Sequence, residues 1–203
     1  MTRISRRRFV GQSLATTAAV LAAPYIAKAQ NSNSKLGVAV VGVNGRGNSH
    51  IGGFTADKRT VVAAIVDVDE YVGKSRAEQV AKKQGFAPKI FRDMREAFDA
   101  DGIDIVSTAT PNHWHALCGI WAMQRGKDTY IEKPVCHNIA EGRALIAAAR
   151  KYKRICQVGT QCRSNPAIIE AMKFLHEGGI GDLKFARGLC YKRRKSIGPL
   201  GNY

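Results

Sequence analysis

A glycine-rich turn and the acidic residue that follows it are the first features of this chain whose types and spacing suit chemistry. The segment G-V-N-G-R-G, residues 42–47, follows a short apolar run, and Asp67 lies 20 positions after Gly47. Glycines permit a tight turn that lets the backbone approach a pyrophosphate, which the N-terminus of a following helix attracts. A carboxylate at the end of the next strand can accept hydrogen bonds from ribose hydroxyls. The spacing therefore predicts a dinucleotide site that uses Gly42, Asn44, Gly45, Arg46, Gly47 and Asp67.

The glycine pattern departs from the usual G-x-G-x-x-G at its middle position. Gly42 and Gly47 hold the outer positions, whereas Asn44 takes the middle one and Gly45 stands beside it. Asn is the residue other than glycine that best tolerates a left-handed backbone. We therefore expect the turn to form, with the Asn44 side chain taking up space beneath the ligand where a glycine would leave it open. An ordinary strand–turn–helix can also contain such glycines. It is the succession of strand, turn, helix, strand and terminal Asp67 that favours the dinucleotide site.

Two later strand ends also hold residues that can do chemistry. Residues 108–115 read T-A-T-P-N-H-W-H, and residues 132–134 read E-K-P. Because parallel sheets bind ligands at the carboxyl ends of their strands, Lys133 could face a nicotinamide ring and hydrogen-bond a substrate hydroxyl. A single lysine at a strand end is more often plain solvated surface. His113 and His115 could begin a metal site, but no third ligand is evident, so none is predicted.

The elements that must position these residues alternate from Lys35 onward. Expected strands are the apolar run from Lys35 and residues 61–66, 89–91, 103–109, 129–132, 155–158 and 183–191. Expected helices are the one after the glycine turn, residues 70–84, 93–98 and 112–124, one that Asn138 and Glu141 begin, and one that Asn165 and Pro166 begin. Repeated β-α alternation predicts an α/β fold with a Rossmann-type doubly wound parallel sheet.

The first 29 residues are typical of an export signal. Residues 5–10 read S-R-R-R-F-V, a mild apolar stretch follows, and Ala27-Lys28-Ala29 fits a cleavage site. We therefore expect a twin-arginine signal peptide over 1–29 and a polar linker over 30–34, and a periplasmic or otherwise exported protein. Twin-arginine export carries folded proteins, so the chain could fold around a cytoplasmic nucleotide first. Such folding also suits five cysteines that include no C-x-x-C pair and that we expect to be mostly buried.

The distribution of charge and of apolar residues argues against a nucleic-acid-binding protein and against a membrane-spanning one. The net charge of +16 is concentrated at the two ends, with five basic residues before residue 30 and six after residue 182. No aromatic–basic interleaving of the kind that binds RNA is present, so nucleic acid is not an expected partner. The apolar stretch near the N-terminus is too short and too rich in alanine for a stable membrane span.

Several of these segments together resemble the Gfo/Idh/MocA oxidoreductases, named for glucose–fructose oxidoreductase, inositol dehydrogenase and a rhizopine-catabolism protein. The resemblance runs through G-V-N-G-R-G at 42–47, I-V-D-V-D at 65–69, A-T-P-N-H-W-H at 109–115, G-K-D-T-Y-I-E-K-P at 126–134 and V-G-T-Q-C-R-S-N-P at 158–166. E-K-P with T-P-N-x-x-H upstream is more specific than any glycine motif. The later segments look most like the exported, twin-arginine branch.

The resemblance implies an NAD(P)-dependent enzyme that acts on a sugar or cyclitol hydroxyl, with NAD favoured by Asp67 and NADP possible. Lys133 would be the catalytic lysine, and the bond before Pro134 is often cis in the family. Gln161 and Arg163 would begin the substrate side. The remaining cofactor contacts that the resemblance implies are Thr110, Pro111, Asn112, His115, Glu132, Lys133 and Pro134.

The resemblance also implies that a part of the usual enzyme is missing. Family members carry a second motif, an Asp followed by a His, in a carboxyl-terminal α/β domain, whereas the last histidine here is His176 and the last acid is Asp182. We therefore expect an NAD(P)-binding domain over 35–160 and the truncated start of the substrate domain over 161–203, from a protein that is a homo-oligomer at full length. An NAD-dependent glycosidase of the same superfamily and a non-catalytic dinucleotide-binding fragment remain alternatives.

Overall fold

The computed structural model describes residues 35–189, and these divide after Gly159 into two compact units. The first unit contains β1 (Leu36–Val41), α2 (Gly47–Ala56), β2 (Thr60–Val66), α3 (Glu70–Gln84), β3 (Lys89–Phe91), α4 (Met94–Asp99), β4 (Ile105–Thr108), α5 (Asn112–Gln124), β5 (Asp128–Glu132), α6 (Ile139–Tyr152) and β6 (Cys156–Gly159). The second contains a 3-10 helix, η1 (Gln161–Ser164), and α7 (Pro166–His176).

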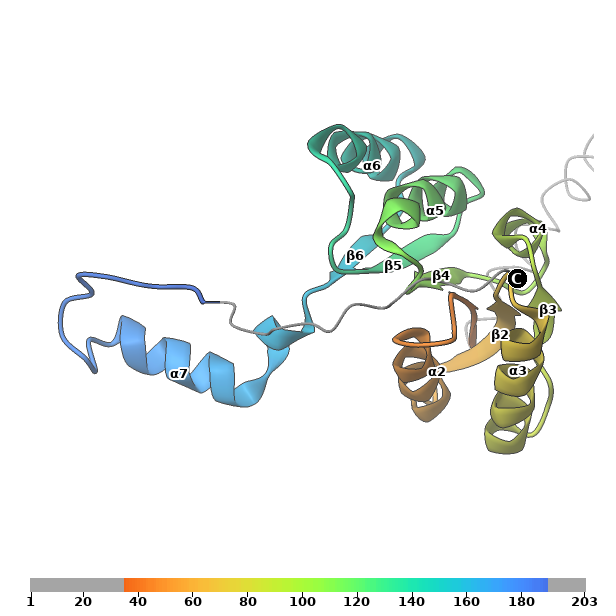
Figure 1. Cartoon of the computed structure of the whole chain (residues 1–203), viewed down its shortest axis with the longest axis horizontal. Helices are drawn as coiled ribbons and strands as arrows, with labels where there is room; N and C mark the ends of the chain where they lie inside the picture. The colour runs from red at the N-terminus through yellow and green to blue at the C-terminus, as the bar shows by residue number, and fades with distance from the viewer. Residues whose placement is uncertain (1–34, 190–203) are drawn as a thin grey trace, which may run out of the picture. The chain divides into compact units, whose positions relative to one another are not determined.

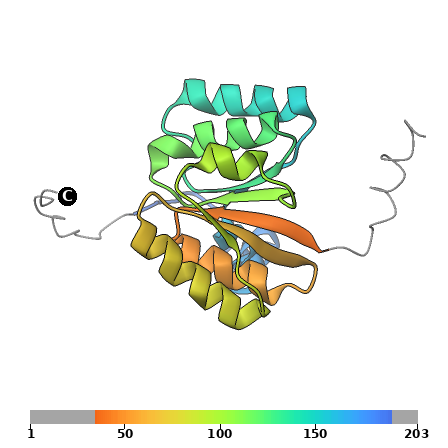
Figure 2. The same cartoon turned by 90° about the vertical axis from the view of Figure 1, so that its right-hand side faces the viewer.

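The first unit is built on one six-stranded sheet whose order is β3-β2-β1-β4-β5-β6, with every neighbouring pair parallel. The order reverses between β1 and β4, which creates a topological switch point at their carboxyl ends. Helices α2 and α3 cover one face of the sheet, and α4, α5 and α6 cover the other (Figures 1 and 2). The predicted Rossmann-type, doubly wound sheet is therefore confirmed.

Alternating side chains of the central strands supply a core on each face of the sheet. Val38 and Val40 of β1 pack with residues of α2 and α3, while Ala39 and Val41 pack with residues of α4 and α5. A third cluster, around Ile131 of β5, joins α5 to α6. Because the central strands are covered on both sides, their sequences are apolar throughout. The rigid strands therefore hold their carboxyl ends in fixed positions.

The helix ends follow the signals that the sequence shows. The Asn138 side chain accepts a hydrogen bond from the Glu141 backbone N–H at 2.9 Å, as expected for a capping box, and the return bond to Glu141 comes at 2.8 Å from the His137 N–H, one residue before the cap. Asp93 caps α4 by accepting from the Arg95 N–H. Gly85 ends α3 in a left-handed conformation. These caps set where each helix begins beside its strand.

The second unit differs from the sequence prediction at its end. No strand forms within 183–189, the described part of the strand that we expected over 183–191. A strand needs a neighbour to accept and donate its backbone hydrogen bonds, and none of the described residues pairs with this segment. The expected signal peptide over 1–29, the linker over 30–34 and Cys190 lie outside the described residues. Within 35–189 no helix is long and apolar enough to cross a membrane.

Candidate functional site: a nucleotide cavity at the switch point

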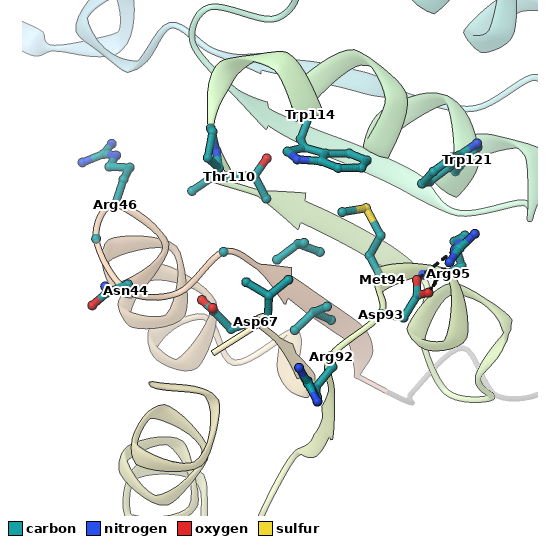
Figure 3. Close-up of a pocket in the computed structure, with 17 residues that line it drawn as sticks. Asn44, Arg46, Asp67, Arg92, Asp93, Met94, Arg95, Thr110, Trp114 and Trp121 are labelled. Carbon is teal, nitrogen blue, oxygen red and sulfur yellow. Dashed lines mark hydrogen bonds and ion pairs between the residues drawn. The ribbon is translucent and has the colours of Figure 1, made fainter. Parts of the chain in front are cut away.

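A cavity of about 800 Å³ opens at the carboxyl ends of β1, β2 and β4 (Figure 3). Thr110 and Trp114 lie on one side of it, and Asp67 and Arg92 lie on the opposite side. The lining residues come from the strand ends, the glycine turn, the start of α4 and two positions along α5, and they are Val41, Gly42, Asn44, Gly45, Arg46, Val66, Asp67, Val68, Arg92, Asp93, Met94, Arg95, Ala109, Thr110, Pro111, Trp114 and Trp121. The cavity thus occupies the position at which doubly wound sheets bind ligands.

The glycine turn leaves room for a ligand at its centre but none at its two ends. Gly42 has φ +77°, and a Cβ there would lie 2.9 Å from the Thr110 nitrogen. A Cβ at Gly47 would collide with the carbonyl oxygen of Gly42. In contrast, a Cβ at Gly45 would meet no protein atom within 4 Å. The open space at Gly45 is therefore the kind of cradle that lets a backbone approach a pyrophosphate at the start of α2.

The conformation of Asn44 differs from the expectation. Lys153 is the one residue other than glycine with a positive φ among residues 35–189, so Asn44 is not left-handed. The positive φ falls on Gly42 instead, and Asn44 is exposed on the cavity wall. Asn44 therefore needs no special backbone tolerance to stand in the middle of the motif.

Asp67 is tied to the glycine turn by its side chain. One carboxylate oxygen accepts a hydrogen bond from the Val43 N–H at 2.8 Å, and the other accepts one from the Asp69 N–H at 3.1 Å. A carboxylate oxygen has more than one lone pair, so both can still accept a bond from a ribose hydroxyl. The tip of β2 is thus held against the turn, with its acidic side chain on the cavity wall.

The cations that follow Asp67 have partners within the protein. Arg76 of α3 donates to the Val43 carbonyl at 3.2 Å and to the Asn44 carbonyl at 3.5 Å, so it braces the glycine turn. Lys74 lies 3.5 Å from Glu70, which also accepts from Arg92 at 3.3 Å. These contacts engage three of the basic residues that follow Asp67 in the sequence.

Glu132 is the centre of a buried network rather than part of the cavity wall. Its side chain is 5% exposed, and it accepts hydrogen bonds from Arg46 at 2.7 Å, from His50 at 3.2 Å and from the Lys133 N–H at 3.0 Å. Burial raises the pKa of Glu132, but these three donors and the charge of Arg46 outweigh it and lower the pKa to about 2. Glu132 is therefore ionised and linked to the glycine turn through Arg46.

His50 completes this network and is a residue that the sequence analysis missed. Its ring lies 2.8 Å from the Ser107 hydroxyl on one side and 3.2 Å from Glu132 on the other. Ser–His–Glu chains of this composition serve as nucleophile, base and orienting acid in hydrolases. Here Ser107 is fully buried, so no substrate can reach its hydroxyl, and the chain has a structural role. The one sequence signal is the place of His50 three residues after Gly47, one helical turn into α2.

Four predicted residues are exposed near the ends of β4 and β5. Pro111 lies in the loop after β4, Asn112 is the first residue of α5, and Lys133 and Pro134 lie in the loop after β5. The bond between Lys133 and Pro134 is cis, as the resemblance suggested. Of these four residues, only Pro111 lines the cavity. The predicted contacts of Lys133, Asn112 and Pro134 with a cofactor thus stay predictions, made for the surface next to the cavity.

His115 supports these two loops from inside. Its ring is 1% exposed, with Nδ1 at 2.6 Å from the Pro134 carbonyl and Nε2 at 2.8 Å from the Thr110 carbonyl. The side chain is therefore no direct cofactor contact, in contrast to the expectation. It joins the loop after β4 to the loop after β5 and so fixes the residues on either side of it.

The two residues predicted for the substrate side lie in the second unit. Gln161 and Arg163 are both in η1, so their role on the substrate side stays a prediction. Cys118 is fully buried, whereas Cys136 and Cys156 are partly buried and Cys162 is exposed, so the expectation of mostly buried cysteines is only partly met. No group of three or more metal-binding side chains occurs within the described range.

Comparisons with known proteins agree with this geometry. The model of the family described as "Oxidoreductase family, NAD-binding Rossmann fold" (GFO_IDH_MocA) matches residues 36–160. A scyllo-inositol 2-dehydrogenase (NAD(+)) from Bacillus subtilis is 35% identical over 57% of this chain and 33% of its own length. A glycosyl hydrolase family 109 protein from Shewanella putrefaciens is 25% identical over 90% of this chain and 45% of its own length.

Solved structures show the same fold. Myo-inositol 2-dehydrogenase from Lactobacillus plantarum matches with a TM-score of 0.65 at 21% identity, over 73% of this chain and 43% of that one. GenD2 from gentamicin A biosynthesis, solved in complex with NAD, matches with a TM-score of 0.63 at 29% identity, over 70% of this chain and 39% of that one. The chain spans less than half the length of these relatives. With its family match, its sheet order and its cavity at the switch point, the chain belongs to the Gfo/Idh/MocA oxidoreductase family, whose NAD-binding Rossmann fold it contains.

Proposed function

We propose that this chain is the cofactor-binding part of an NAD-dependent oxidoreductase that acts on a hydroxyl of a sugar or cyclitol. The observation that supports this most is the cavity that combines the open cradle at Gly45 with the carboxylate of Asp67. The pyrophosphate of NAD would lie at the cradle and at the start of α2, and the adenosine ribose would lie against Asp67. NAD would supply the hydride acceptor.

Lys133 is the proposed catalytic residue. Its ammonium group would donate a hydrogen bond to the substrate hydroxyl at the edge of the sheet next to the cavity. The substrate class follows the relatives, which include the scyllo-inositol dehydrogenase and a levoglucosan dehydrogenase that is 34% identical over 55% of this chain. Both are named for oxidising a polyhydroxylated ring.

NAD is proposed in preference to NADP because of the charges around Asp67. A 2′-phosphate on the ribose would meet the Asp67 carboxylate, which is unfavourable. Arg76 is held by the carbonyls of the turn, whereas Lys74 and Arg92 form only exposed pairs with Glu70, so the preference rests on the charge of Asp67. The expected order of affinity is therefore NAD above NADP.

The test is a calorimetric titration of the purified chain with NAD and NADP, repeated on Asp67→Ala. We expect NAD to bind and Asp67→Ala to reduce its affinity by about tenfold, the value of one lost hydrogen bond to a charged group. Asp101→Ala, an exposed acid in the turn before β4, is the matched control and should bind NAD as the unchanged chain does. If NAD affinity is the same in Asp67→Ala, the assignment of Asp67 is wrong.

An NAD-dependent glycosidase is the second candidate. The family 109 glycosyl hydrolase from Shewanella putrefaciens aligns with 90% of this chain, including segments after residue 160. In such a reaction a sugar hydroxyl is oxidised transiently and the hydride is returned. Assays of the full-length protein distinguish the two: net NADH indicates the dehydrogenase, whereas released sugar without net NADH indicates the glycosidase.

A binding role without turnover is the third candidate for the 203-residue chain itself. The chain covers 33% of one curated relative and 45% of another, and a role in binding alone would need no more than the nucleotide cavity. Any NAD-dependent turnover of a sugar by the purified chain would exclude this candidate.

Export through the twin-arginine pathway is proposed from residues 5–10, S-R-R-R-F-V. The test is a fusion of residues 1–34 to a reporter that is active only after export in the folded state. Replacing Arg6 and Arg7 with lysine should abolish export, and an exported double variant would contradict the proposal.

A further inference from the structure

His50 connects α2 to two neighbouring strands from a buried position. The residue is 7% exposed, and both nitrogens of its ring have a partner. Nδ1 lies 2.8 Å from the hydroxyl of Ser107 on β4, and Nε2 lies 3.2 Å from Glu132 at the end of β5. The ring of Tyr130 packs against it edge-on, with centroids 5.3 Å apart. His50 is therefore held on three sides in one orientation.

The partners define which nitrogen of His50 carries the proton. Glu132 is ionised and can only accept, so Nε2 must donate to it. Burial lowers the pKa of His50, and this outweighs the opposing effect of Glu132, so the ring is neutral at neutral pH. Nδ1 then has a free lone pair and accepts from the Ser107 hydroxyl. Both ring nitrogens of His50 therefore have a hydrogen-bond partner, Ser107 on one side and Glu132 on the other.

The same carboxylate holds the backbone of Lys133. The second oxygen of Glu132 accepts a hydrogen bond from the Lys133 N–H at 3.0 Å. Arg46 also donates to Glu132, but its side chain is 47% exposed on the turn that faces the cavity, where an incoming pyrophosphate can compete for it. His50 is buried and no ligand can reach it. It is thus a side-chain donor to Glu132 that stays in place when the cavity fills.

We infer that His50 is a positioning residue for Lys133: it orients the Glu132 carboxylate, and Glu132 in turn fixes the backbone of Lys133 beside the cavity. The inference rests on the proposed function insofar as Lys133 is taken to act at the nicotinamide end of NAD. The placement of the Lys133 backbone itself does not depend on that function and can be measured without a cofactor.

The test compares His50→Gln with His50→Asn in the 203-residue chain. The longer Gln side chain places an amide where Nε2 stands and can still donate to Glu132, whereas the Asn amide reaches only the Ser107 side. Both variants keep a polar, uncharged side chain, so they are a matched pair. Denaturation curves establish that both fold.

The first measurement is amide hydrogen exchange and the NMR signal of the Lys133 N–H. We expect the unchanged chain and His50→Gln to share a protected, shifted signal, and His50→Asn to lose protection about tenfold. If the Lys133 signal and its exchange are the same in His50→Asn as in the unchanged chain, the inference is overturned, whether or not NAD binds.

The second measurement is the affinity for NAD and for ADP-ribose, which lacks the nicotinamide. We expect His50→Asn to weaken NAD about tenfold and ADP-ribose less than twofold, with NAD affinity restored in His50→Gln. An equal loss for both ligands would mean that His50 only places α2, and would overturn the inference. If the unchanged chain binds neither ligand, the proposed function fails. Hydrogen exchange of the Lys133 N–H then tests by itself whether His50 positions Lys133.

Discussion

The guanidinium of Arg46 lies 2.7 Å from the buried carboxylate of Glu132 and joins two segments that are 86 residues apart. Arg46 stands at the start of α2, and Glu132 ends β5 directly before Lys133. The two strands that precede them are separated in the sheet by β4, so the ion pair spans the switch point. The turn that would hold a pyrophosphate is therefore linked, through Glu132, to the backbone of Lys133.

The coupling between Arg46 and Glu132 can be measured by a double-mutant cycle on the free energy of unfolding. Because Arg46 is about half exposed and screened by solvent, we expect Arg46→Gln to cost about 1 kcal/mol. Glu132→Gln should cost a similar amount, and the coupling energy should be about 0.5–1.5 kcal/mol. The exposed pair Arg59–Asp57 is the control, and Arg59→Gln should leave the free energy of unfolding nearly unchanged. A coupling energy of zero for the first pair would contradict the geometry.

Glu132 also makes stability depend on pH in a defined range. Its pKa is about 2 in the folded chain against 4.5 in the absence of these contacts. A lowered pKa means that the unfolded chain takes up the proton first, so stability is fully present above pH 4.5 and is lost as the pH falls toward 2. Urea denaturation across this range should show a steeper decline for the unchanged chain than for Glu132→Gln. Parallel curves would show that Glu132 is not the group responsible.

His50 adds a second contribution at higher pH with the same sign. Burial lowers its pKa below 6.5, so the unfolded chain binds a proton that the folded chain does not. Stability should therefore begin to decline as the pH falls below 6.5, and His50→Gln should remove this early part of the decline while it leaves the later part from Glu132.

Substitutions at two glycines of the turn should affect stability and NAD affinity separately. Gly47→Ala should destabilise the chain by about 1–3 kcal/mol, because the added methyl group collides with the Gly42 carbonyl. Gly45→Ala should leave stability nearly unchanged, since its methyl group meets no protein atom. The same methyl group would occupy the proposed pyrophosphate cradle, so we expect Gly45→Ala to reduce NAD affinity by at least about tenfold. Unchanged NAD affinity in Gly45→Ala would place the pyrophosphate elsewhere.

Much of the fold could be predicted from the sequence because its signals are local. Glu70–Gln84 and Asn112–Gln124 have the bounds that capping residues and glycines indicated. The parallel sheet follows from the alternation of apolar strands and helices. The strand expected over 183–191 fails within 183–189 because its apolar pattern is local, whereas a strand requires a partner, which a pattern does not supply.

The site could be predicted only in part because its key contacts are distant in the sequence. Gly42 and Asp67 belong to a motif of fixed spacing and line the cavity as predicted. The contact between His50 and Glu132 joins residues 82 positions apart, and nothing in either segment shows that they meet. The burial of His115 between two carbonyls likewise depends on how the loops after β4 and β5 pack.

The two tryptophans provide the most direct test of ligand entry, because both tryptophans of the chain line the cavity. Trp114 is 38% exposed at the start of α5, and its ring centroid lies 6.3 Å from that of Trp121. Trp121 is further covered by the guanidinium of Arg95 at 5.7 Å. A nucleobase that enters this end of the cavity can therefore stack on Trp114 but not on Trp121. We expect NAD to quench the tryptophan emission of the chain and of Trp121→Phe, and Trp114→Phe to lose most of the quenching. Equal quenching in the two variants would contradict this arrangement, since it would mean that the base does not approach Trp114 preferentially.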